Sequence, residues 1–440
     1  MSRTSLAYRL LVRAAVGAIP LAAPFHAKLA RSHQRRRGAL ERLTAWARAQ
    51  RDPRRPLVWM HAPSVGEGLQ ARAVLQRLQA RRPDWQIAYT YFSPSAEEFA
   101  RGQPADISEY LPYDTPEAAR EALDLLQPSA LVFAKLDVWP ELATSAAERG
   151  IPAGLIAGTV SPVSGRVGWP SRLLIRPGYA ALSAVGAIAD SDAERLIGLG
   201  VAPHRIQVTG DPRYDSVLDV ISNVSPDDPL VALGRAAPTL VAGSTWPADE
   251  SVVLEAFAAV RSTHPEARLM LVPHEPTPDH LARTETLAGR VGLRAPVRLG
   301  PNPAPDSWIL VDRTGVLARL YGAGTMAYVG GGFGRAGLHS VLEPAAWGLP
   351  VVFGPEWRNS REAAVLQQAG AGCSLPRGST AAAARLAGIW RAWLSNEAAR
   401  GEAGERARKV VRDGAGAAER SAALVEQLVV GFPGPVPTDR

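Results

Sequence analysis

The chain has 440 residues, 46% of them hydrophobic and 21% charged, so two or three soluble domains are expected and a polytopic membrane protein is not. The single cysteine, Cys373, excludes an intrachain disulfide framework and a cysteine-based metal site. No stretch reaches the roughly 18 uninterrupted apolar residues of a spanning helix, and a cytosolic location fits.

The net charge of +7 is concentrated at the N-terminus. Residues 1–55 hold 13 Lys or Arg against Glu41 and Asp52, a local charge of +11, which leaves −4 for the rest. Residues 1–50 therefore read as a basic amphipathic leader that associates with an anionic membrane surface, where each Lys or Arg contributes about 1 kcal/mol. Two alternatives stay open: Arg-rich composition from coding bias, and a cleaved signal peptide with residues 14–25 as its apolar region.

Nucleic acid is not the expected partner of this leader. Aromatic residues that could stack on bases are sparse among its arginines, and no zinc-finger or RNP pattern occurs.

From residue 57 onward, short apolar runs alternate with helical patterns, which predicts a parallel sheet covered by helices in residues 51–225. Ala71, Val74, Leu75 and Leu78 follow the spacing of one helix face, and Thr115 with Pro116 reads as a helix cap and first turn. The expected strands are "LVWMHA" (57–62), "QIAYTYF" (86–92), "ALVFAK" (130–135), "PAGLIAG" (152–158), "AVGAIADS" (184–191) and "RIQVTGD" (205–211).

A polar, Pro-containing segment is the expected linker, residues 226–238, before a second unit of the same kind in residues 239–430. Its expected strands are "TLVAGST" (239–245), "ARLMLVPHEP" (267–276), "WILVDRTG" (308–315), "MAYVGGG" (326–332) and "PVVFGP" (350–355). Terminal helices are expected in 380–430 and a flexible tail in 431–440. The predicted fold is α/β, two doubly wound Rossmann-like domains facing a central cleft, with functional residues at the C-terminal edges of both sheets.

Glu67 follows the first predicted strand in "WMHAPSVGEGL" and lies between Gly66 and Gly68. These glycines would let the backbone bend tightly or approach a ligand. A carboxylate at a helix start is favoured by the helix dipole and stays ionised, so it would act as a base. This stretch alone allows a second reading, in which Glu67 merely complements the dipole.

A glycine-rich loop, "GGGFGRAGLHSVLEPAAWG" (330–348), follows a predicted strand and precedes a predicted helix, which suits a nucleotide phosphate. Ser340 and Glu343 also have capping-box spacing, so the loop could simply be a helix start. Neither candidate site contains an Asp-x-Asp cluster or a His pair at ligand spacing, so no metal or other cofactor is expected.

The segment "HAPSVGE" (61–67) resembles the His-Ala-x-Ser-Val-Gly-Glu motif of the bacterial Kdo transferases. These are membrane-associated GT-B enzymes that move 3-deoxy-octulosonic acid (Kdo) from CMP onto a lipid A precursor. Further matches over about residues 57–360 are "LPYDTP", "DVWPEL", "VTGDPRYD", "AGSTWPADE", "LVPHEP", "LYGAGTMAYVGGGF" and "GLHSVLEPAAWGLPVVFGP". The leader is also similar to the family's membrane-binding N-terminus.

The resemblance implies an inverting glycosyltransferase with CMP-Kdo as donor and a lipid A-type acceptor, at the cytoplasmic face of the inner membrane, peripheral or monotopic. It makes Glu67 the general base and gives Arg213 the place of a family Lys that stabilises developing negative charge. It implies donor or acceptor binding by Ser64, Gly66 and Asp137, and nucleotide binding by Ser244, Thr245, Pro273, His274, Gly315, Gly337, His339, Ser340 and Glu343.

The sequence departs from the family pattern at Lys135, which replaces a Glu assigned to transition-state stabilisation and is predicted to act in catalysis here. Its amine is expected either to pair with Asp137, on the same face of an extended segment, or to meet an anionic group of the substrate. Other departures are His274-Glu275 for Arg-His, Leu338 and Ser340 for Gly and Asn, Val316 for Glu, and Ala157-Gly158-Thr159-Val160-Ser161 for Asn-Ala-Arg-Leu-Ser.

Three alternative functions stay open. One is the transfer of a different nucleotide sugar to a membrane lipid. The second is a catalytically silent scaffold that binds nucleotide or lipid, which Lys135 favours. The third is a nucleotide-sugar epimerase, since such enzymes share the two-domain fold.

Overall fold

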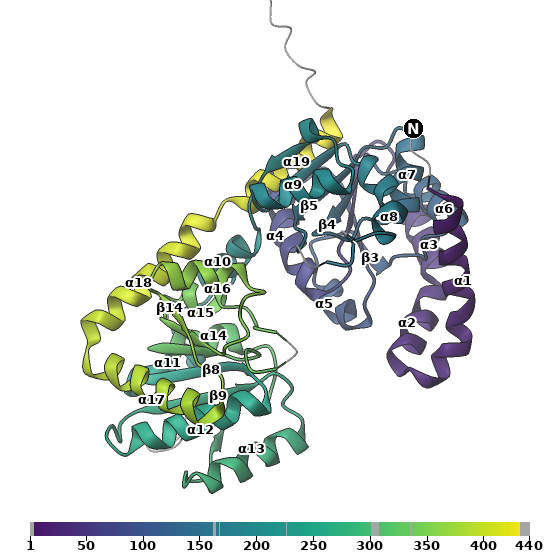
Figure 1. The fold of residues 1–440 in the computed structure, drawn as a ribbon. Helices are drawn as coiled ribbons and strands as arrows, with labels where there is room; N and C mark the ends of the chain where they lie inside the picture. Colours follow the sequence, from purple (N-terminus) through teal and green to yellow (C-terminus); the bar gives the residue numbers. More distant parts are fainter. Residues whose placement is uncertain are drawn as a thin grey trace, which may run out of the picture. The chain divides into compact units, whose positions relative to one another are not determined.

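The structure is a computed structural model that describes residues 4–161, 164–166, 168–225, 227–300, 308–334 and 337–431. The chain forms two compact units (Figure 1): unit 1 comprises Met1–Ser216 and Ala415–Arg440, and unit 2 comprises Val217–Gly414. Each unit is built on a seven-stranded parallel sheet. The predicted fold of two doubly wound Rossmann-like domains is confirmed.

Unit 1 contains a sheet in the order β3-β2-β1-β4-β5-β6-β7. Its strands are β1 (Leu57–His61), β2 (Gln86–Tyr91), β3 (Ile107–Tyr110), β4 (Ala130–Ala134), β5 (Ala153–Gly158), β6 (Ala184–Ala187) and β7 (Ile206–Val208). Strand β1 pairs with β2 on one side and β4 on the other, so Trp59 lies between Ala88 and Leu131. The strand order reverses at β1, and ligands of such sheets bind where the order reverses.

Helices cover both faces of this sheet. The helices of unit 1 are α1 (Leu6–Ala22), α2 (Ala27–Arg37), α3 (Ala39–Gln50), α4 (Val65–Arg81), α5 (Glu97–Arg101), α6 (Pro116–Leu126), α7 (Pro140–Glu148), α8 (Ser171–Ala180), α9 (Asp190–Leu199) and α19 (Ala417–Val430), and α10 (Arg213–Ser222) begins in unit 1 and ends in unit 2. The predicted face of α4 is buried, and the Thr115 hydroxyl caps α6 by accepting a hydrogen bond from the Ala118 amide at 3.3 Å. Both local predictions are confirmed.

The predicted leader is not a single element. Helices α1 and α2 form a pair at one side of unit 1 (Figure 1), whereas α3 buries Leu43 and Trp46 in the core with Leu57. Residues 39–50 are therefore part of the first domain. The helix Leu6–Phe25 has 20 residues, a mean hydropathy of 1.5 and no buried part, so by length and composition alone it could cross a membrane, as signal sequences could.

Unit 2 contains a sheet in the order β10-β11-β9-β8-β12-β13-β14. The strands are β8 (Thr239–Thr245), β9 (Arg268–Pro273), β10 (Val297–Arg298), β11 (Ile309–Leu310), β12 (Met326–Val329), β13 (Val351–Phe353) and β14 (Gly372–Ser374). The helices are α11 (Pro229–Ala232), α12 (Pro247–Arg261), α13 (Pro278–Arg290), α14 (Leu317–Leu320), α15 (Leu342–Ala346), α16 (Arg361–Gln368), α17 (Ser379–Ser395) and α18 (Glu397–Gly414).

Three further domain boundaries differ from the prediction. The first domain, predicted to end at residue 225, passes into unit 2 after Ser216. The predicted linker 226–238 contains α11, whose first turn is capped by Asp228, and it belongs to unit 2. The predicted range 239–430 ends too late, because α19 packs on the sheet of unit 1, where Leu428 lies over Gly154. Residues 432–440 of the predicted tail lie outside the described residues.

Candidate functional site

Glu67 and Lys135 meet at the C-terminal edge of the unit 1 sheet. Glu67 lies in the first turn of α4, after β1, and Lys135 directly follows β4, the neighbour of β1. The Lys135 ammonium donates to Oε1 of Glu67 at 2.9 Å, and the Ser64 hydroxyl donates to Oε2. The predicted Lys135–Asp137 pair is wrong, because Asp137 pairs with Arg166 instead.

The backbone of Lys135 explains this change of partner. Its φ is +68°, a left-handed conformation, so its side chain does not follow strand alternation. The residue is held there by its amide, which donates to the Ile156 carbonyl of β5 at 2.8 Å. Such a conformation costs a residue other than glycine about 1–2 kcal/mol, and strained positions of this kind cluster at functional sites.

The Glu67 carboxyl is ionised at neutral pH. Burial raises its pKa, but the charge of Lys135 and the hydrogen bonds from Ser64 and Lys135 outweigh burial, so the pKa lies below the usual range. An ionised carboxylate at this edge can accept a proton from a bound hydroxyl.

The predicted tight bend at the two glycines that flank Glu67 is absent. Both are helical, and neither has a positive φ. A Cβ on Gly68 would lie 2.5 Å from the Phe99 ring and 2.9 Å from the Tyr89 hydroxyl, so close packing requires this glycine. A Cβ on Gly66 would meet only Ser64 Oγ, at 3.8 Å.

Two further acid–base pairs lie in the loops at this edge. Arg166 donates to Asp137, and Arg213 donates to Asp211 through two nitrogens, at 2.9 and 2.6 Å. In all three pairs the cation is the more exposed partner: the side-chain exposures are 40% against 14% for Lys135–Glu67, 35% against 27% for Arg166–Asp137, and 40% against 3% for Arg213–Asp211. The edge therefore presents cations to solvent, which suits an anionic ligand.

His61, the first residue of the matched motif, has a structural role. It is fully buried, and its Nε2 accepts a hydrogen bond from Trp139 Nε1 at 3.0 Å. Its Nδ1 therefore carries the proton and faces Thr90 Oγ1 at 3.0 Å. Burial lowers the His61 pKa to about 3, so the ring is neutral and fixes Trp139 at the start of α7.

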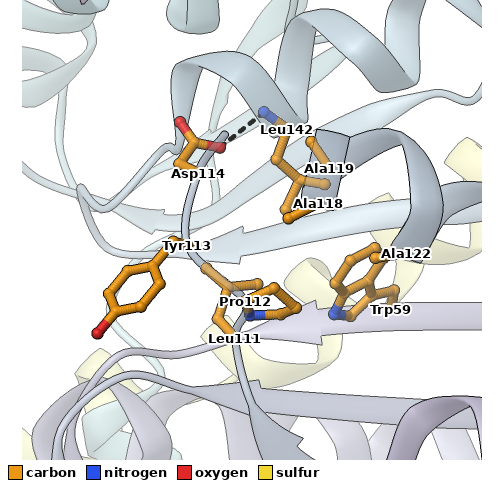
Figure 2. Close-up of a pocket in the computed structure, with 9 residues that line it drawn as sticks. All are labelled: Trp59, Leu111, Pro112, Tyr113, Asp114, Ala118, Ala119, Ala122 and Leu142. Carbon is orange, nitrogen blue, oxygen red and sulfur yellow. Dashed lines mark hydrogen bonds between the residues drawn. The ribbon is translucent and has the colours of Figure 1, made fainter. Parts of the chain in front are cut away.

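Asp114, in the matched "LPYDTP" segment, connects α7 to α1. Its carboxylate accepts from the Glu141 and Leu142 amides at 3.0 and 2.9 Å and from the Tyr8 hydroxyl at 2.7 Å. Burial raises the Asp114 pKa to about 6. Figure 2 shows Asp114 and Leu142 among the residues of a small pocket, whose other lining residues are Trp59, Leu111, Pro112, Tyr113, Ala118, Ala119 and Ala122.

In unit 2, three aromatic rings gather at the C-terminal ends of β8 and β9. The rings of His274 and His339 are stacked with centroids 4.3 Å apart, and the Trp246 centroid lies 5.0 Å from that of His274. Trp246 Nε1 donates to His339 Nε2 at 3.1 Å. Burial, with a smaller effect of the neighbouring His274, lowers the His339 pKa to about 4. The predicted histidines are thus brought together, and Trp246, which was not predicted as a site residue, joins them.

The glycine-rich loop packs tightly against the end of β8. A Cβ on Gly330 would lie 2.3 Å from the Ser244 carbonyl oxygen, so this close approach requires glycine. Ser244 itself has a φ of +53°, at a register shift in β8. The Asp249 carboxylate fixes the loop by accepting from the Gly331 amide at 2.9 Å and from the Trp246 amide at 3.0 Å. Thr245 donates to Glu250 at 3.1 Å.

The capping-box reading of Ser340 and Glu343 is wrong. Helix α15 begins after Val341, and no side chain caps it. Within the described residues, the Glu343 carboxyl has no hydrogen-bond partner, and burial raises its pKa to about 7. A carboxyl without a protein partner is available to ligand hydroxyls.

The remaining predicted nucleotide residues also lie near strand ends. Gly315 and Gly337 have φ values of +81° and +84°, and Pro273 ends β9. Over the described part of the chain, no group of three or more His, Cys, Asp or Glu residues is arranged to hold a metal ion.

Helix α1 turns polar side chains toward the rest of unit 1 and leaves large apolar side chains exposed to solvent. Tyr8 binds Asp114, Arg9 donates to Glu141 at 2.9 Å, and Arg13 pairs with Glu117. The large apolar side chains on the outside of α1, together with Phe25 in the turn that follows it, are 56–83% exposed; those of α1 are Leu6, Leu10, Leu11 and Leu21. Farther along the leader, Arg31 and Arg35 pair with Glu97, and Arg42 pairs with Glu109. Much of the leader's positive charge is therefore neutralised within unit 1.

Comparisons with known proteins agree with this architecture. The sequence profile of the family described as 3-deoxy-D-manno-octulosonic-acid transferase (kdotransferase) matches residues 34–216. The chain is 32% identical to a 3-deoxy-D-manno-octulosonic acid transferase of Bordetella pertussis, over 84% of this chain and 86% of that protein. It is 30% identical to a 3-deoxy-D-manno-octulosonic acid transferase of Chlamydophila psittaci, over 73% of this chain and 75% of that protein.

Solved structures match in fold. A glycosyltransferase from Rickettsia africae superposes with a TM-score of 0.58 and 11% identity, over 86% of this chain and 99% of that one. A UDP-GlcNAc 2-epimerase from Neisseria meningitidis superposes with a TM-score of 0.61 and 13% identity, over 85% of this chain and 100% of that one. The fold is that of the GT-B class, and the chain is a glycosyltransferase that belongs to the 3-deoxy-D-manno-octulosonic acid transferase family.

Proposed function

We propose that this enzyme transfers Kdo from CMP-Kdo to a lipid A-type acceptor in lipopolysaccharide biosynthesis, with inversion at the anomeric carbon. The observation that carries the proposal is the ionised Glu67 carboxylate, which lies among exposed cations at the C-terminal edge of the unit 1 sheet. Both substrates are anionic, the donor through its carboxylate and phosphate and the acceptor through its phosphates, and such an edge attracts anions. The relatives' names supply the sugar.

In the proposed reaction, Glu67 accepts the proton of the acceptor hydroxyl while the hydroxyl oxygen forms a bond to the anomeric carbon. The bond from that carbon to the phosphate oxygen breaks, and CMP leaves with the electron pair. Arg213 stabilises the negative charge that develops as CMP departs. A single displacement of this kind inverts the anomeric configuration.

Unit 2 holds the nucleotide in this proposal. The proposed phosphate site lies beside the stacked His274 and His339 and the tightly packed glycine-rich loop after β12. Glu343, which lacks a protein partner among the described residues, accepts the ribose hydroxyls.

The proposed location is the cytoplasmic face of the inner membrane, with α1 lying in the membrane surface. Its exposed leucines suit the acyl boundary. A transverse orientation is disfavoured because Tyr8, Arg9 and Arg13 are bound to carboxylates of unit 1, and a crossing helix would draw those charges into lipid.

The direct test is to incubate the purified protein with CMP-Kdo and a lipid A-type acceptor in detergent and to read the products by mass spectrometry. Kdo added to the acceptor, with loss of that product in Glu67→Gln, supports the proposal. Parallel incubations with UDP-sugars distinguish Kdo transfer from the transfer of another sugar. A panel that yields no glycosylated lipid, or an epimerised nucleotide sugar, contradicts it.

A further inference from the structure

Lys135 is the least anchored of the three cations at the edge of the unit 1 sheet. Arg213 makes two bonds to the buried Asp211, and Arg166 bonds both Asp137 and the Leu136 carbonyl. The Lys135 ammonium has three donors and, within the described residues, a single partner, Glu67, at 2.9 Å. Its side chain is 40% exposed.

We propose that Lys135 is a substrate-displaced partner of the base. In the free protein its ammonium neutralises Glu67, and an anionic group of the substrate, a carboxylate or a phosphate, draws the ammonium away and leaves Glu67 free to accept a proton. This inference rests on the proposed function, which supplies the hydroxyl that Glu67 deprotonates. Lys135 keeps its own proton throughout.

The geometry favours such an exchange. Only the lysine end of the pair is exposed, at 40% against 14% for Glu67, and the flexible lysine stem lets the ammonium swing to another anion. The backbone of Lys135 is fixed in its left-handed conformation by the bond to Ile156, so only the side chain needs to move. Glu67 cannot follow the ammonium, because the Ser64 hydroxyl holds its other oxygen.

Loss of the ammonium changes the basicity of Glu67. Its pKa is raised by burial and lowered mainly by Lys135. Two titratable groups on which the Glu67 charge acts are neutral: the Tyr89 phenol of β2, whose pKa burial raises, and the His61 ring of β1, whose pKa burial lowers to about 3. Displacement of Lys135 by an anion therefore leaves burial as the main influence, and the Glu67 pKa rises.

The test measures the Glu67 pKa by ¹³C NMR of the side-chain carboxyl in full-length protein, with Glu67→Gln to assign the signal. The probes are free Kdo and its methyl ester, then a lipid A-type bisphosphate and its dephosphorylated form in detergent. A rise of at least one pKa unit with Kdo but not its ester identifies a carboxylate as the displacing group. A rise with the bisphosphate alone identifies a phosphate.

Lys135→Met is the decisive variant. Its Glu67 pKa should be high without ligand and should not rise further with either probe, whereas Lys135→Arg should keep a low starting value. Lys409→Met, which breaks the exposed Lys409–Asp413 pair of α18, is the matched control and should behave as wild type. Thermal melting of each variant monitors folding.

Kinetics give a second readout. As pH is lowered, the wild-type kcat should begin to fall at a higher pH than kcat/KM does. The reason is that kcat reports the substrate complex, in which the Lys135–Glu67 pair is lost, whereas kcat/KM reports the free enzyme. In Lys135→Met both should fall at the same pH. A wild-type Glu67 pKa that no anionic probe moves, or an equal rise in Lys135→Met, overturns the inference. Absence of Kdo transfer together with a Lys135-dependent rise overturns the proposed function, while the displacement of Lys135 from Glu67 by an anion still holds.

Discussion

Gln70 donates a hydrogen bond from Nε2 to Oδ1 of Asp211 at 3.0 Å, and so ties the loop after β7 to the helix that carries Glu67. Asp211 in turn holds the Arg213 guanidinium at 2.6 and 2.9 Å. Gln70 lies one turn after Glu67 on α4, so Glu67 and Arg213 are both fixed to this helix. The hydrogen bond joins residues that lie 141 positions apart in the chain.

We expect Arg213→Gln to lower kcat by about 10² to 10³, the usual effect of removing one group that stabilises developing charge. Arg213→Lys should recover part of the activity, because the charge returns without the two-pronged contact to Asp211. Arg205→Gln makes the same chemical change at the N-terminal end of β7, away from this edge of the sheet, and serves as the control. Initial rates at saturating substrate measure the effect, and an unchanged kcat would remove Arg213 from the mechanism.

We expect Glu67→Gln to preserve folding and nucleotide affinity but to lower kcat by about 10² to 10⁴, the usual contribution of a general base. Because the pKa of Glu67 is lowered in the free protein, the wild-type kcat/KM should persist at low pH and fall only below the usual range of a glutamate. The pH profile of kcat/KM checks this. Equal activity of the variant would mean that Glu67 only complements the dipole of α4.

The sequence predicted every strand that is paired on both sides, because these form continuous apolar runs. It also predicted the edge strand β7, and it missed the other three edge strands, β3, β10 and β14. The residues of β3 are partly exposed at one end, and β10 has only two residues. Short edge strands are defined by a single neighbour, and no local apolar pattern reveals that neighbour. The place of α19 in unit 1 was missed for a related reason, since its periodicity does not say which sheet it covers.

The candidate site was predicted in part. Glu67 could be found from the matched motif and its position after a strand. The partner of Lys135 could not, because the prediction assumed an extended backbone and the residue has a φ of +68°. Trp246 was missed because its contact with His339 spans 93 positions. Its place directly after Ser244 and Thr245 was the one available signal.

We expect Glu343→Gln to stabilise the protein while weakening CMP binding. The folded-state pKa of this carboxyl is raised from 4.5 to about 7, so the folded state loses stability as pH rises through that window. The amide removes this loss but binds ribose hydroxyls less well than a carboxylate, by about 1.5 to 3 kcal/mol. Melting temperatures at pH 5 and 8 and calorimetric titration with CMP measure the two effects. A variant that loses stability with intact affinity would make Glu343 a structural residue.

Asp114 should make the free energy of unfolding depend on pH in the acid range, as Glu343 does. Its pKa is raised from 3.8 to about 6 in the folded state, so the folded state binds a proton more tightly between these values. The free energy of unfolding therefore falls as pH rises from about 4 to 6, by about 1.4 kcal/mol per unit of pKa shift. Asp114→Asn should flatten this dependence, and the exposed Asp84→Asn should not. Parallel pH profiles of wild type and Asp114→Asn would contradict the assignment.

We expect the exposed leucines of α1, and not the leader's positive charges, to supply most of the free energy of membrane binding. Leu10 and Leu11 are 57% and 56% exposed, whereas Arg9 and Arg13 pair with carboxylates of unit 1 and contribute little charge to a lipid surface. Full burial of a leucine is worth about 1.5 to 3 kcal/mol, so Leu10→Glu with Leu11→Glu should lower the partition coefficient on anionic vesicles by at least about tenfold.

Val430→Glu is the matched control, because Val430 is 67% exposed on α19, a helix that carries none of the leader's leucines. High salt should weaken vesicle binding less than the double substitution does, since salt screens charges and leaves apolar contacts intact. Cosedimentation at low and high salt compares the two effects. If salt releases the protein while the leucine variant stays bound, the unneutralised basic residues of the leader, and not the outer face of α1, attach the enzyme to the membrane.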